Sequence, residues 1–412
     1  MADPRLLVVG AGAAGLMAAI HAARVGAQVT VLERTADGGR KILISGGGRC
    51  NVLPSMAAER RFVTDSSRRI LSRLLGSWPL DAQRHFFEAT LGIPLALEPD
   101  TGKLFPVSNR AREVRDRLVS EARAAGASFR FGVTVRNLVP TASGWNAELD
   151  GGTVLGADRI ILATGGLSVP QTGSDGIGLA VAERLGHRMV PTYPALTPLT
   201  AAPSVHAELA GVSLRVRIVA SWRGETAESD GGFLFTHRGY SGPTVLDVSH
   251  LAVRSRLLGR GDAELRVRWT GADPAAWDER LRIQSRQTVA TVLRAELPDR
   301  LAARLLGEAG VPADRTLSQL SREERRILVQ AVADYPLPWT GDEGYKKAEV
   351  TGGGVGLGEV HPATMESRRA PGLFLCGEIL DAFGPIGGYN FSWAWATGRL
   401  AGLGAAGSPS RP

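Results

Sequence analysis

The chain has 412 residues, of which 44% are hydrophobic and 22% are charged, so a disordered or fibrous protein is excluded. No stretch approaches the roughly 20 consecutive apolar residues of a membrane span, and we expect a cytoplasmic protein without membrane contact. The net charge of +7 invites a nucleic-acid interpretation, but arginine alternates with acid in segments such as RAREVRDRLVSEAR, which is typical of a solvated helix face.

The N-terminal segment carries a glycine motif between a predicted strand and a predicted helix. Residues 5–9 form an apolar run, residues 13–25 show helical periodicity, and the GxGxxG between them consists of Gly10, Gly12 and Gly15. A second apolar run, residues 28–32, leads to Glu33, an acid that can bind a ribose diol. This context predicts a dinucleotide site with the pyrophosphate at the helix N-terminus, and the acid favours FAD or NAD over NADP.

A second glycine-rich stretch, GGRKILISGGGRCN at residues 38–51, follows directly. A linker, a phosphate cradle and a nucleic-acid contact are three interpretations of it. Its place just after Glu33 favours the cradle, because a dinucleotide laid along the first motif must pass here. Residues 42–44 can anchor the stretch in the core. The side chains available to offset pyrophosphate charge are Arg40, Lys41 and Arg49.

The next part of the chain alternates helical and strand patterns. Helices are predicted at 80–92 and 109–126, with a hairpin in LALEPDTGKLFPV between them. Residues 129–166 indicate several strands. The last of these, 159–163, ends in ATGG and is expected to return beside the first strand, with its glycines close to the dinucleotide.

The remaining segments differ in pattern. Residues 194–269 contain alternating stretches such as SLRVRIVASW, which indicate strands, and residues 278–334 indicate helices. Near the C-terminus, a strand at 373–376 precedes a glycine pair that opens a helix, whose N-terminus can hold the partial negative charge of a reduced flavin. Taken alone, an ordinary strand-to-helix crossover explains this last segment equally well. Beside the N-terminal motif, the flavin interpretation is favoured.

Six segments carry a family resemblance. They are VVGAGAAGLMAA, GGRKILISGGGRCN, ATGG, FLFTHRGYSGPTVLDVS, EVTGGGVGLGEVHPATMES and GLFLCGEILDAFGPIGGYNFSWAWATGRLAG. With these motifs the chain resembles the BaiN/RdsA-type bacterial flavoproteins, NAD(P)/FAD-dependent oxidoreductases that include aminoacetone-oxidase-like members. The resemblance implies an α/β fold with a discontinuous Rossmann-like FAD-binding domain at 1–193 and 346–412. It also implies an inserted β-rich, barrel-like domain at 194–275 (plus about 335–345) and a small helical subdomain at 276–334.

The resemblance also implies FAD as cofactor and a set of residues around it. On the adenosine and pyrophosphate side these are Gly10, Gly12, Ala14, Gly15, Glu33 and Arg34, with Val133, Thr134 and Val135 near the adenine. On the ribityl and flavin side they are Arg40, Lys41, Ser45, Gly46, Gly48, Arg49, Cys50, Asn51, Gly377, Glu378, Asp381, Gly387, Gly388, Tyr389 and Asn390. Further predicted cofactor-binding residues are Gly39, Thr164, Gly165 and Gly166. One departure is Cys376, where alanine is usual; we interpret it as a small buried hydrophobe.

The reaction class is then oxidation–reduction, because FAD carries the electrons. No second GxGxxG lies between a strand and a helix, and TGGGVGLGEV at 351–360 is better explained as a close-packed turn near the flavin. NAD(P)H would therefore bind transiently over the flavin. Alternatively, the substrate would reduce the flavin as in an amine oxidase, and oxygen would reoxidise it.

The predicted catalytic residues are His237, Tyr240 and Asn390. His237 can move protons near neutral pH, with Tyr240 as a hydrogen-bonding neighbour. The alternative is a turn shaped by its glycines that His237 merely caps. The tryptophans at 393 and 395 are expected to pack in the core.

We therefore expect a FAD-dependent oxidoreductase that transfers electrons between the flavin and a small organic substrate, with NAD(P)H or oxygen as the other partner. The two cysteines lie far apart and the histidines form no HExxH pair, so neither a disulfide nor a metal site is expected. An RNA-modifying flavoprotein, motivated by the net charge, and a non-catalytic flavin-binding regulatory protein are the alternatives.

Overall fold

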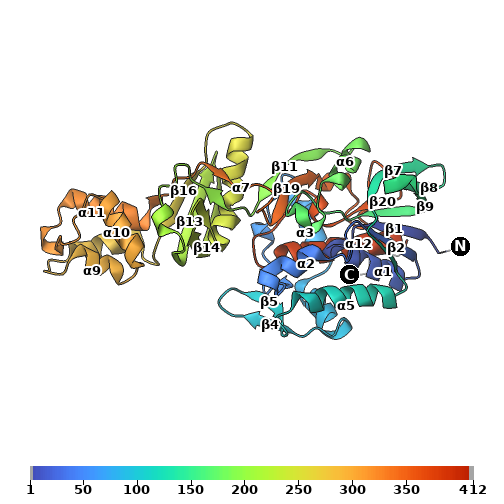
Figure 1. Ribbon diagram of the computed structural model, residues 1–412, viewed down its shortest axis with the longest axis horizontal. Coiled ribbons are helices and arrows are strands. Elements are labelled where there is room, and N and C mark those ends of the chain that lie inside the picture. Colours follow the sequence, from blue (N-terminus) through green and yellow to red (C-terminus); the bar gives the residue numbers. More distant parts are fainter. Residues whose placement is uncertain (1–2, 408–412) are drawn as a thin grey trace. The chain divides into compact units, whose positions relative to one another are not determined.

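The computed structural model describes residues 3–407 (Figure 1). The chain divides into two compact units, residues 1–192 with 350–412 (unit 1) and residues 193–349 (unit 2). Each unit has its own hydrophobic core. The predicted separation of a β-rich domain and a helical subdomain within the insertion stays a prediction.

Unit 1 is built on a five-stranded parallel sheet. In spatial order its strands are β20 (Leu373–Leu375), β10 (Arg159–Leu162), β1 (Arg5–Val9), β2 (Gln28–Glu33) and β6 (Ser128–Phe131). The strands are mostly apolar because a parallel sheet is covered on both faces. The order places the strand that ends in ATGG beside β1, as predicted. The expected Rossmann-like α/β domain is thereby confirmed.

Three long helices accompany this sheet: α1 (Ala13–Arg24), α5 (Ala111–Ala124) and α12 (Tyr389–Ala405). Helix α1 packs against both of the others (Figure 1). Glycines allow α12 to approach closely, since a Cβ on Gly402 would lie 2.3 Å from the carbonyl oxygen of Ala18. Trp393 and Trp395 are buried in α12, which confirms the prediction that they belong to the core.

Smaller elements surround the parallel sheet. Two three-stranded antiparallel sheets consist of β3 (Leu53–Pro54), β5 (Lys103–Pro106) and β4 (Leu95–Glu98), and of β7 (Val135–Thr141), β8 (Gly144–Leu149) and β9 (Val154–Ala157). The β4–β5 pair is the predicted hairpin. The short helices are α2 (Arg40–Ile44), α3 (Arg68–Gly76), α4 (Leu80–His85) and α6 (Ile177–Arg184). The predicted helix at 80–92 starts as α4 and continues as a π-helix over Phe86–Thr90.

Residues 351–360 differ from the predicted turn. They begin within a fully buried strand, β19 (Val350–Val355), which pairs with β11 (Met189–Ala195). Gly353 has a φ of +75°, and a Cβ there would lie 2.2 Å from the carbonyl oxygen of Pro191. The glycines therefore serve close backbone packing of a strand, and the turn begins only at 356.

Unit 2 contains a seven-stranded antiparallel sheet and the five remaining α-helices among the described residues. The strand order is β17 (Tyr335–Pro336), β16 (Glu264–Arg268), β13 (Ser213–Trp222), β14 (Glu225–Phe235), β15 (Gly239–Ser241), β12 (Leu199–Thr200) and β18 (Gly341–Asp342). The helices are α7 (Pro243–Leu257), α8 (Pro274–Arg282), α9 (Val289–Arg294), α10 (Asp299–Glu308) and α11 (Arg322–Ala333). Helix α7 lies in a segment for which only strands were predicted. None of the described helices is both long and apolar enough to cross a membrane.

Candidate functional site

The first glycine loop lies at the carboxyl end of β1. Gly10 has a φ of +103°, and a Cβ there would lie 2.5 Å from the carbonyl oxygen of Ala163. A Cβ on Gly15 would lie 1.9 Å from the carbonyl oxygen of Gly10, whereas a Cβ on Gly12 would meet nothing within 4 Å. Gly10 and Gly15 thus serve close packing. Gly12 leaves open space beside the N-terminus of α1, and no side chain caps this N-terminus. Such a helix start can bind an anion.

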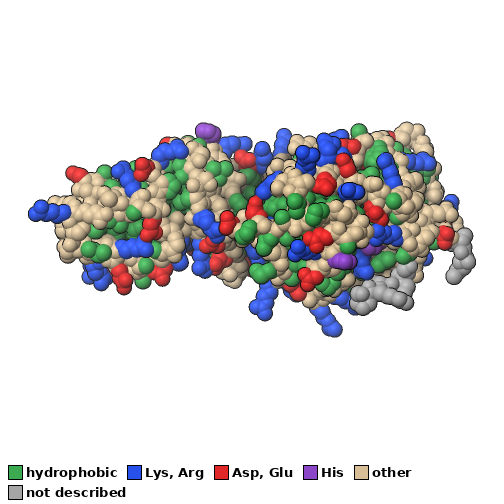
Figure 2. All heavy atoms as spheres, turned by 90° about the horizontal axis from the view of Figure 1, so that it is seen from below, with side chains coloured by type: hydrophobic (Ala, Val, Ile, Leu, Met, Phe, Trp, Pro, Cys, Tyr) green, Lys and Arg blue, Asp and Glu red, His purple; other side chains and the backbone are tan. Residues whose placement is uncertain are grey.

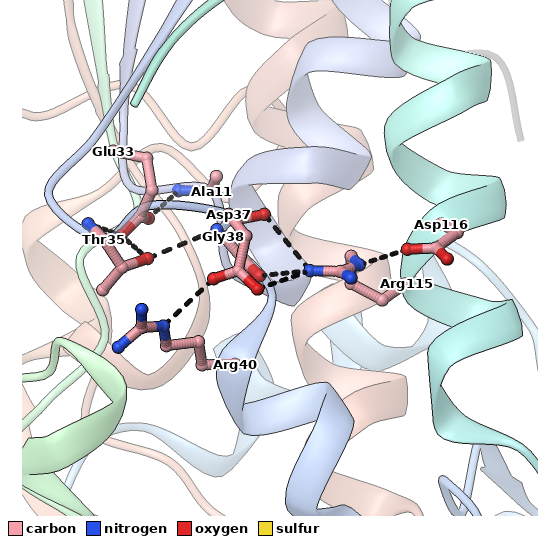
Figure 3. Close-up of polar contacts among 8 residues, drawn as sticks. All are labelled: Ala11, Glu33, Thr35, Asp37, Gly38, Arg40, Arg115 and Asp116. Carbon is pink, nitrogen blue, oxygen red and sulfur yellow. Dashed lines mark hydrogen bonds and ion pairs between the residues drawn. The ribbon is translucent and has the colours of Figure 1, made fainter. Parts of the chain in front are cut away.

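Glu33 joins this loop to the end of β2. One oxygen of its buried carboxylate accepts the N–H of Ala11 at 2.8 Å, and the other accepts the N–H and the hydroxyl of Thr35, each at 2.7 Å (Figure 3). The carbonyl of Glu33 accepts the N–H of Val133 at 2.9 Å, and that of Thr134 accepts the N–H of Asp150 at 2.9 Å. The segment predicted to pass near the adenine therefore starts beside the acid predicted to bind the ribose.

The stretch 38–51 folds into α2 followed by a 3-10 helix, Ser45–Gly48. Gly39 has a φ of +62° and donates its N–H to the carbonyl of Ala11 at 2.8 Å, so the stretch is joined to the first loop. Gly46 and Gly48 also have positive φ values and are exposed. The predicted anchor is only partly correct: Ile42 is buried, but Ile44 is 49% exposed, because the short helix presents a single face to the core.

The basic side chains predicted to offset pyrophosphate charge all have carboxylate partners. The pairs are Arg40–Asp37 (3.1 Å), Arg49–Glu98 (3.0 Å) and Lys41–Glu378 (2.7 Å). Arg34, which is predicted only as a cofactor-binding residue, pairs with Asp175. Arg49 also lies over the ring of Phe105. These carboxylates offset the positive charge of the stretch 38–51. The role of its cations toward a pyrophosphate therefore stays a prediction.

Lys41 and Glu378 belong to a polar cluster drawn from four segments. The ammonium group of Lys41 also donates to the hydroxyl of Ser168 at 2.7 Å, and this hydroxyl donates to Glu378 at 2.6 Å. The N–H of Thr351 donates to the same carboxylate at 3.0 Å. A Cβ on Gly166 would lie 2.3 Å from the hydroxyl oxygen of Thr351, so only glycine fits there. The sequence did not single out Ser168 or Thr351 as site residues, although Ser168 lies two residues after Gly166 and Thr351 is the first residue of the glycine-rich segment 351–360.

The C-terminal segment meets both glycine loops. Gly377 has a φ of +80°, and a Cβ there would lie 2.8 Å from the Cβ of Ala14. A Cβ on Gly388 would lie 2.5 Å from the backbone of Leu53, two residues after Asn51. The start of α12 thus packs against the end of the stretch 38–51.

Three predicted residues at this end have defined partners. The amide of Asn390 donates to the carbonyl of Gly384 and accepts its N–H, both at 2.9 Å, which supports a loop-shaping role and leaves its catalytic role a prediction. Tyr389 packs edge-on against Phe62, and a Cβ on Gly387 would lie 3.6 Å from the Tyr389 ring. The third residue, Asp381, accepts hydrogen bonds from residues 64–66.

Asp381 is a buried carboxylate that fastens a neighbouring segment. One oxygen accepts the hydroxyl of Ser66 at 2.8 Å, and the hydroxyl of Thr64 and the N–H of Asp65, each at 3.1 Å. Burial raises the pKa of Asp381 to about 6, although these hydrogen bonds from Ser66 and Thr64 favour its charged form. A group with this pKa exchanges protons close to neutral pH.

The residues of unit 1 fit a bound FAD. Four buried side-chain polar atoms of unit 1 have no partner among the described residues, and two of these are the amide oxygen of Asn51 and the hydroxyl of Thr164. Both belong to segments predicted to line the cofactor, and Thr164 lies behind Gly10. Together with the space beside Gly12, they provide hydrogen-bonding capacity that the protein itself leaves unused.

The two predicted catalytic residues of unit 2 lie in different environments. Tyr240 is fully buried, and its hydroxyl hydrogen-bonds the imidazole of His206 at 2.8 Å. Burial raises the pKa of this phenol. His237 is exposed on the turn between β14 and β15, and its carbonyl accepts the hydroxyl of Ser204. The geometry supports a core-packing role for Tyr240, and the catalytic role of His237 stays a prediction.

Residues 4–404 match the family model described as HI0933-like protein Rossmann domain. The chain is 35% identical to the 3-dehydro-bile acid delta(4,6)-reductase of Clostridium scindens, over 98% of this chain and 100% of that one. It is 33% identical to the ribosomal RNA dihydrouridine synthase of Escherichia coli, over 95% of each chain. A solved 3-ketosteroid delta1-dehydrogenase from Sterolibacterium denitrificans shares the fold, with a TM-score of 0.55 and 13% identity over 99% of this chain and 100% of that one.

Proposed function

The chain belongs to the HI0933-like family of FAD-dependent oxidoreductases, and we propose that it reduces a carbon–carbon double bond conjugated to a carbonyl group. Similarity along nearly the whole chain to two differently named relatives carries this proposal. The named reactions share one step, since a delta(4,6)-reductase and a dihydrouridine synthase both add hydrogen across a ring double bond conjugated to a carbonyl. Bound FAD supplies the electrons for such a step.

Two features of the chain support a role in this chemistry. The N-terminus of α12 has neither a side-chain cap nor an acidic residue in its first turn, so its free N–H groups can hold negative charge at the cofactor. The predicted proton carrier is His237, because imidazole is the side chain that most often acts as a general acid or base in enzymes. NADH or NADPH is the proposed electron donor.

A small organic substrate is the first candidate. On the face shown in Figure 2, basic and acidic side chains are intermixed, so the net charge of +7 is not gathered into one patch there. A small carbonyl compound requires no such patch.

Uracil in RNA is the second candidate, and one segment favours it. Residues 59–73 contain five exposed arginines against two acidic residues; the arginines are Arg60, Arg61, Arg68, Arg69 and Arg73. Val63 exchanges both backbone hydrogen bonds with Phe383, and Ser66 bonds Asp381. The basic segment therefore adjoins the loop that precedes α12, where a phosphate backbone would need cations.

The experiment starts with anaerobic reduction of the purified yellow protein by NADH or NADPH, followed through the visible flavin absorbance. The reduced protein is then mixed with cyclic enones or with uridine-containing ribosomal RNA fragments. We expect reoxidation together with a product that is heavier by two hydrogen atoms. Reduced protein that no conjugated carbonyl compound or RNA reoxidises would contradict the proposal.

One variant separates the two candidate substrates, and a second tests the proton carrier. If RNA is the substrate, Arg69→Ser combined with Arg73→Ser weakens RNA binding, and binding by the wild type falls steeply with salt. The matched control is Arg112→Ser with Arg117→Ser, which removes two exposed arginines from α5. For either substrate, His237→Ala slows turnover with FAD still bound, whereas His85→Ala, at an exposed histidine of unit 1, does not.

A further inference from the structure

Arg115 is a buried arginine on a helix whose sequence is typical of a solvated surface. Its side chain is only 8% exposed, whereas Arg112 and Arg117 on the same helix are exposed. Figure 3 shows it extending from α5 to the turn that follows Thr35. A buried guanidinium requires several partners, because its desolvation is costly.

These partners lie in the turn at residues 37–39. One terminal nitrogen of Arg115 donates to the carboxylate of Asp37 at 3.1 Å and to the carbonyls of Asp37 and Gly38, each at 3.3 Å (Figure 3). Its Nε donates to the neighbouring Asp116. A planar guanidinium can serve two carbonyls and two carboxylates at once, which a lysine ammonium on one flexible stem does less well.

The alkyl part of Arg115 also shapes this turn. A Cβ on Gly39 would lie 2.5 Å from the Cγ of Arg115, so the side chain packs directly on the glycine backbone. Gly38 packs on the first glycine loop, since a Cβ there would lie 2.9 Å from the Cβ of Ala11. The turn is thus held between α5 and the first glycine loop.

Two hydrogen bonds connect this turn to the predicted cofactor residues. The N–H of Gly39 donates to the carbonyl of Ala11, whose own N–H is held by Glu33. The second oxygen of the Asp37 carboxylate accepts the Nε of Arg40, so Asp37 bridges Arg115 to the first residue of α2 (Figure 3). Displacing Arg115 would remove the contacts that hold the turn 37–39 to α5. Arg40 would then lose the orientation that Asp37 gives it, and the hydrogen bond from Gly39 to Ala11 would be weakened.

We propose that Arg115 is a positioning residue for the pyrophosphate end of FAD: it contacts no cofactor atom itself, but holds the turn 37–39 against Ala11 so that both glycine loops face one ligand. The role is independent of which substrate the flavin reduces. Asp37 is the residue through which Arg115 acts on Arg40.

The test measures ligand binding to the apoprotein instead of activity. Arg115→Met removes the donors and keeps much of the alkyl chain, and Arg117→Met is the matched control on the exposed face of α5. FAD, ADP and riboflavin are titrated separately, because ADP carries the pyrophosphate whereas riboflavin carries the flavin without a phosphate. We expect Arg115→Met to weaken FAD and ADP binding by about 10- to 100-fold, the range found for residues that support metal ligands, with little change for riboflavin.

Further variants distinguish positioning from a general loss of structure. Arg115→Lys should restore part of the FAD and ADP affinity, since it returns a charge near Asp37. Asp37→Asn should weaken both ligands, and its combination with Arg115→Met should cost little more than either change alone, because the two residues act through one contact. If Arg115→Met does not fold, the titrations are made on Arg115→Lys and Asp37→Asn.

Three results would overturn the proposal. The first is FAD affinity within twofold of that of the Arg117→Met control. The second is an equal loss of riboflavin and ADP binding. The third is a fully additive loss when the Asp37 and Arg115 changes are combined.

Discussion

Cys376 stands directly before the Gly377-Glu378 pair, where a thiol could act as a redox partner of the flavin. Its side chain is fully buried, and burial raises the pKa of this thiol. Cys50, within the second glycine stretch, is also fully buried, and burial raises its pKa to about 12. Because the thiolate is the reactive form of cysteine, both groups are unreactive at neutral pH, which agrees with their interpretation as small hydrophobes.

We therefore predict that neither thiol takes part in electron transfer. Cys376→Ala should retain bound FAD and should take up the same number of electrons as the wild type in an anaerobic reductive titration. Iodoacetamide at pH 8 should label neither cysteine in the native protein and both after denaturation. An additional pair of electrons taken up by the wild type alone would contradict this prediction.

Asp381 gives a prediction for the pH dependence of stability. Its pKa is about 6 in the folded protein against an ordinary value of 3.8, so between these pH values the folded state binds more protons than the unfolded state. The contribution of this group is therefore fully present below about pH 4 and is lost as pH rises through about 6. Asp381→Asn, which keeps an acceptor for Ser66, should stabilise the apoprotein at pH 7 by up to about 3 kcal/mol.

The measurement is urea unfolding of the apoprotein across this pH range. The difference in unfolding free energy between Asp381→Asn and wild type should vanish below about pH 4 and grow toward pH 7. Asp81→Asn, at an exposed carboxylate of α4, serves as the control. A difference that does not vary with pH would show that Asp381 titrates as in the unfolded chain.

At the scale of elements, the contact between α1 and α12 positions the first glycine loop. Cβ atoms added at Gly398 and Gly402 would lie 2.4 Å and 2.3 Å from carbonyl oxygens of α1, so two backbones touch where side chains normally intervene. Such contacts cannot be relieved by rotating a side chain. The helices would have to separate, and Ala14, whose carbonyl Gly398 touches, belongs to the segment that is predicted to bind the pyrophosphate.

We predict that Gly402→Ala lowers the free energy of unfolding by about 1 to 3 kcal/mol through overpacking, despite the better helix propensity of alanine. Gly307→Ala in α10 is the matched control: nothing lies within 4 Å of the added Cβ, so we expect stability to be unchanged or to rise by up to about 1 kcal/mol. Equal effects of the two changes, measured by urea unfolding, would contradict the backbone contact.

The elements of unit 1 were largely predictable because their signals are local. The GxGxxG spacing and the flanking apolar runs indicated β1, α1 and β2 to within one residue at each end. Helix α7 was missed because it buries residues on most of its circumference, so its sequence shows no apolar stripe. Arg115 was missed for another reason: its partner Asp37 lies 78 residues away, and periodicity does not indicate which arginine of a charged helix faces inward.

At the scale of the molecule, the two units have separate hydrophobic cores. The core residues of unit 1 end at Ala182 and resume at Val355, and those of unit 2 lie between Leu199 and Leu337. The residues predicted to bind FAD belong to unit 1 alone. A ligand stabilises only the cooperative unit that binds it, since its free energy of binding is lost when that unit unfolds.

We therefore predict two thermal transitions for the apoprotein, of which FAD shifts only one. At a free FAD concentration of about 100 times its Kd, unit 1 gains about 2.7 kcal/mol, which for a unit of this size corresponds to an increase in Tm of roughly 5 to 10 °C. Calorimetry with and without FAD measures the Tm of each transition. Proteolysis during heating assigns each transition to its unit, because the fragments are identified by their mass. In Arg115→Met the same FAD concentration should shift the unit 1 transition less, because the bound fraction falls. A single transition that moves as a whole with FAD would instead show that the two cores unfold together.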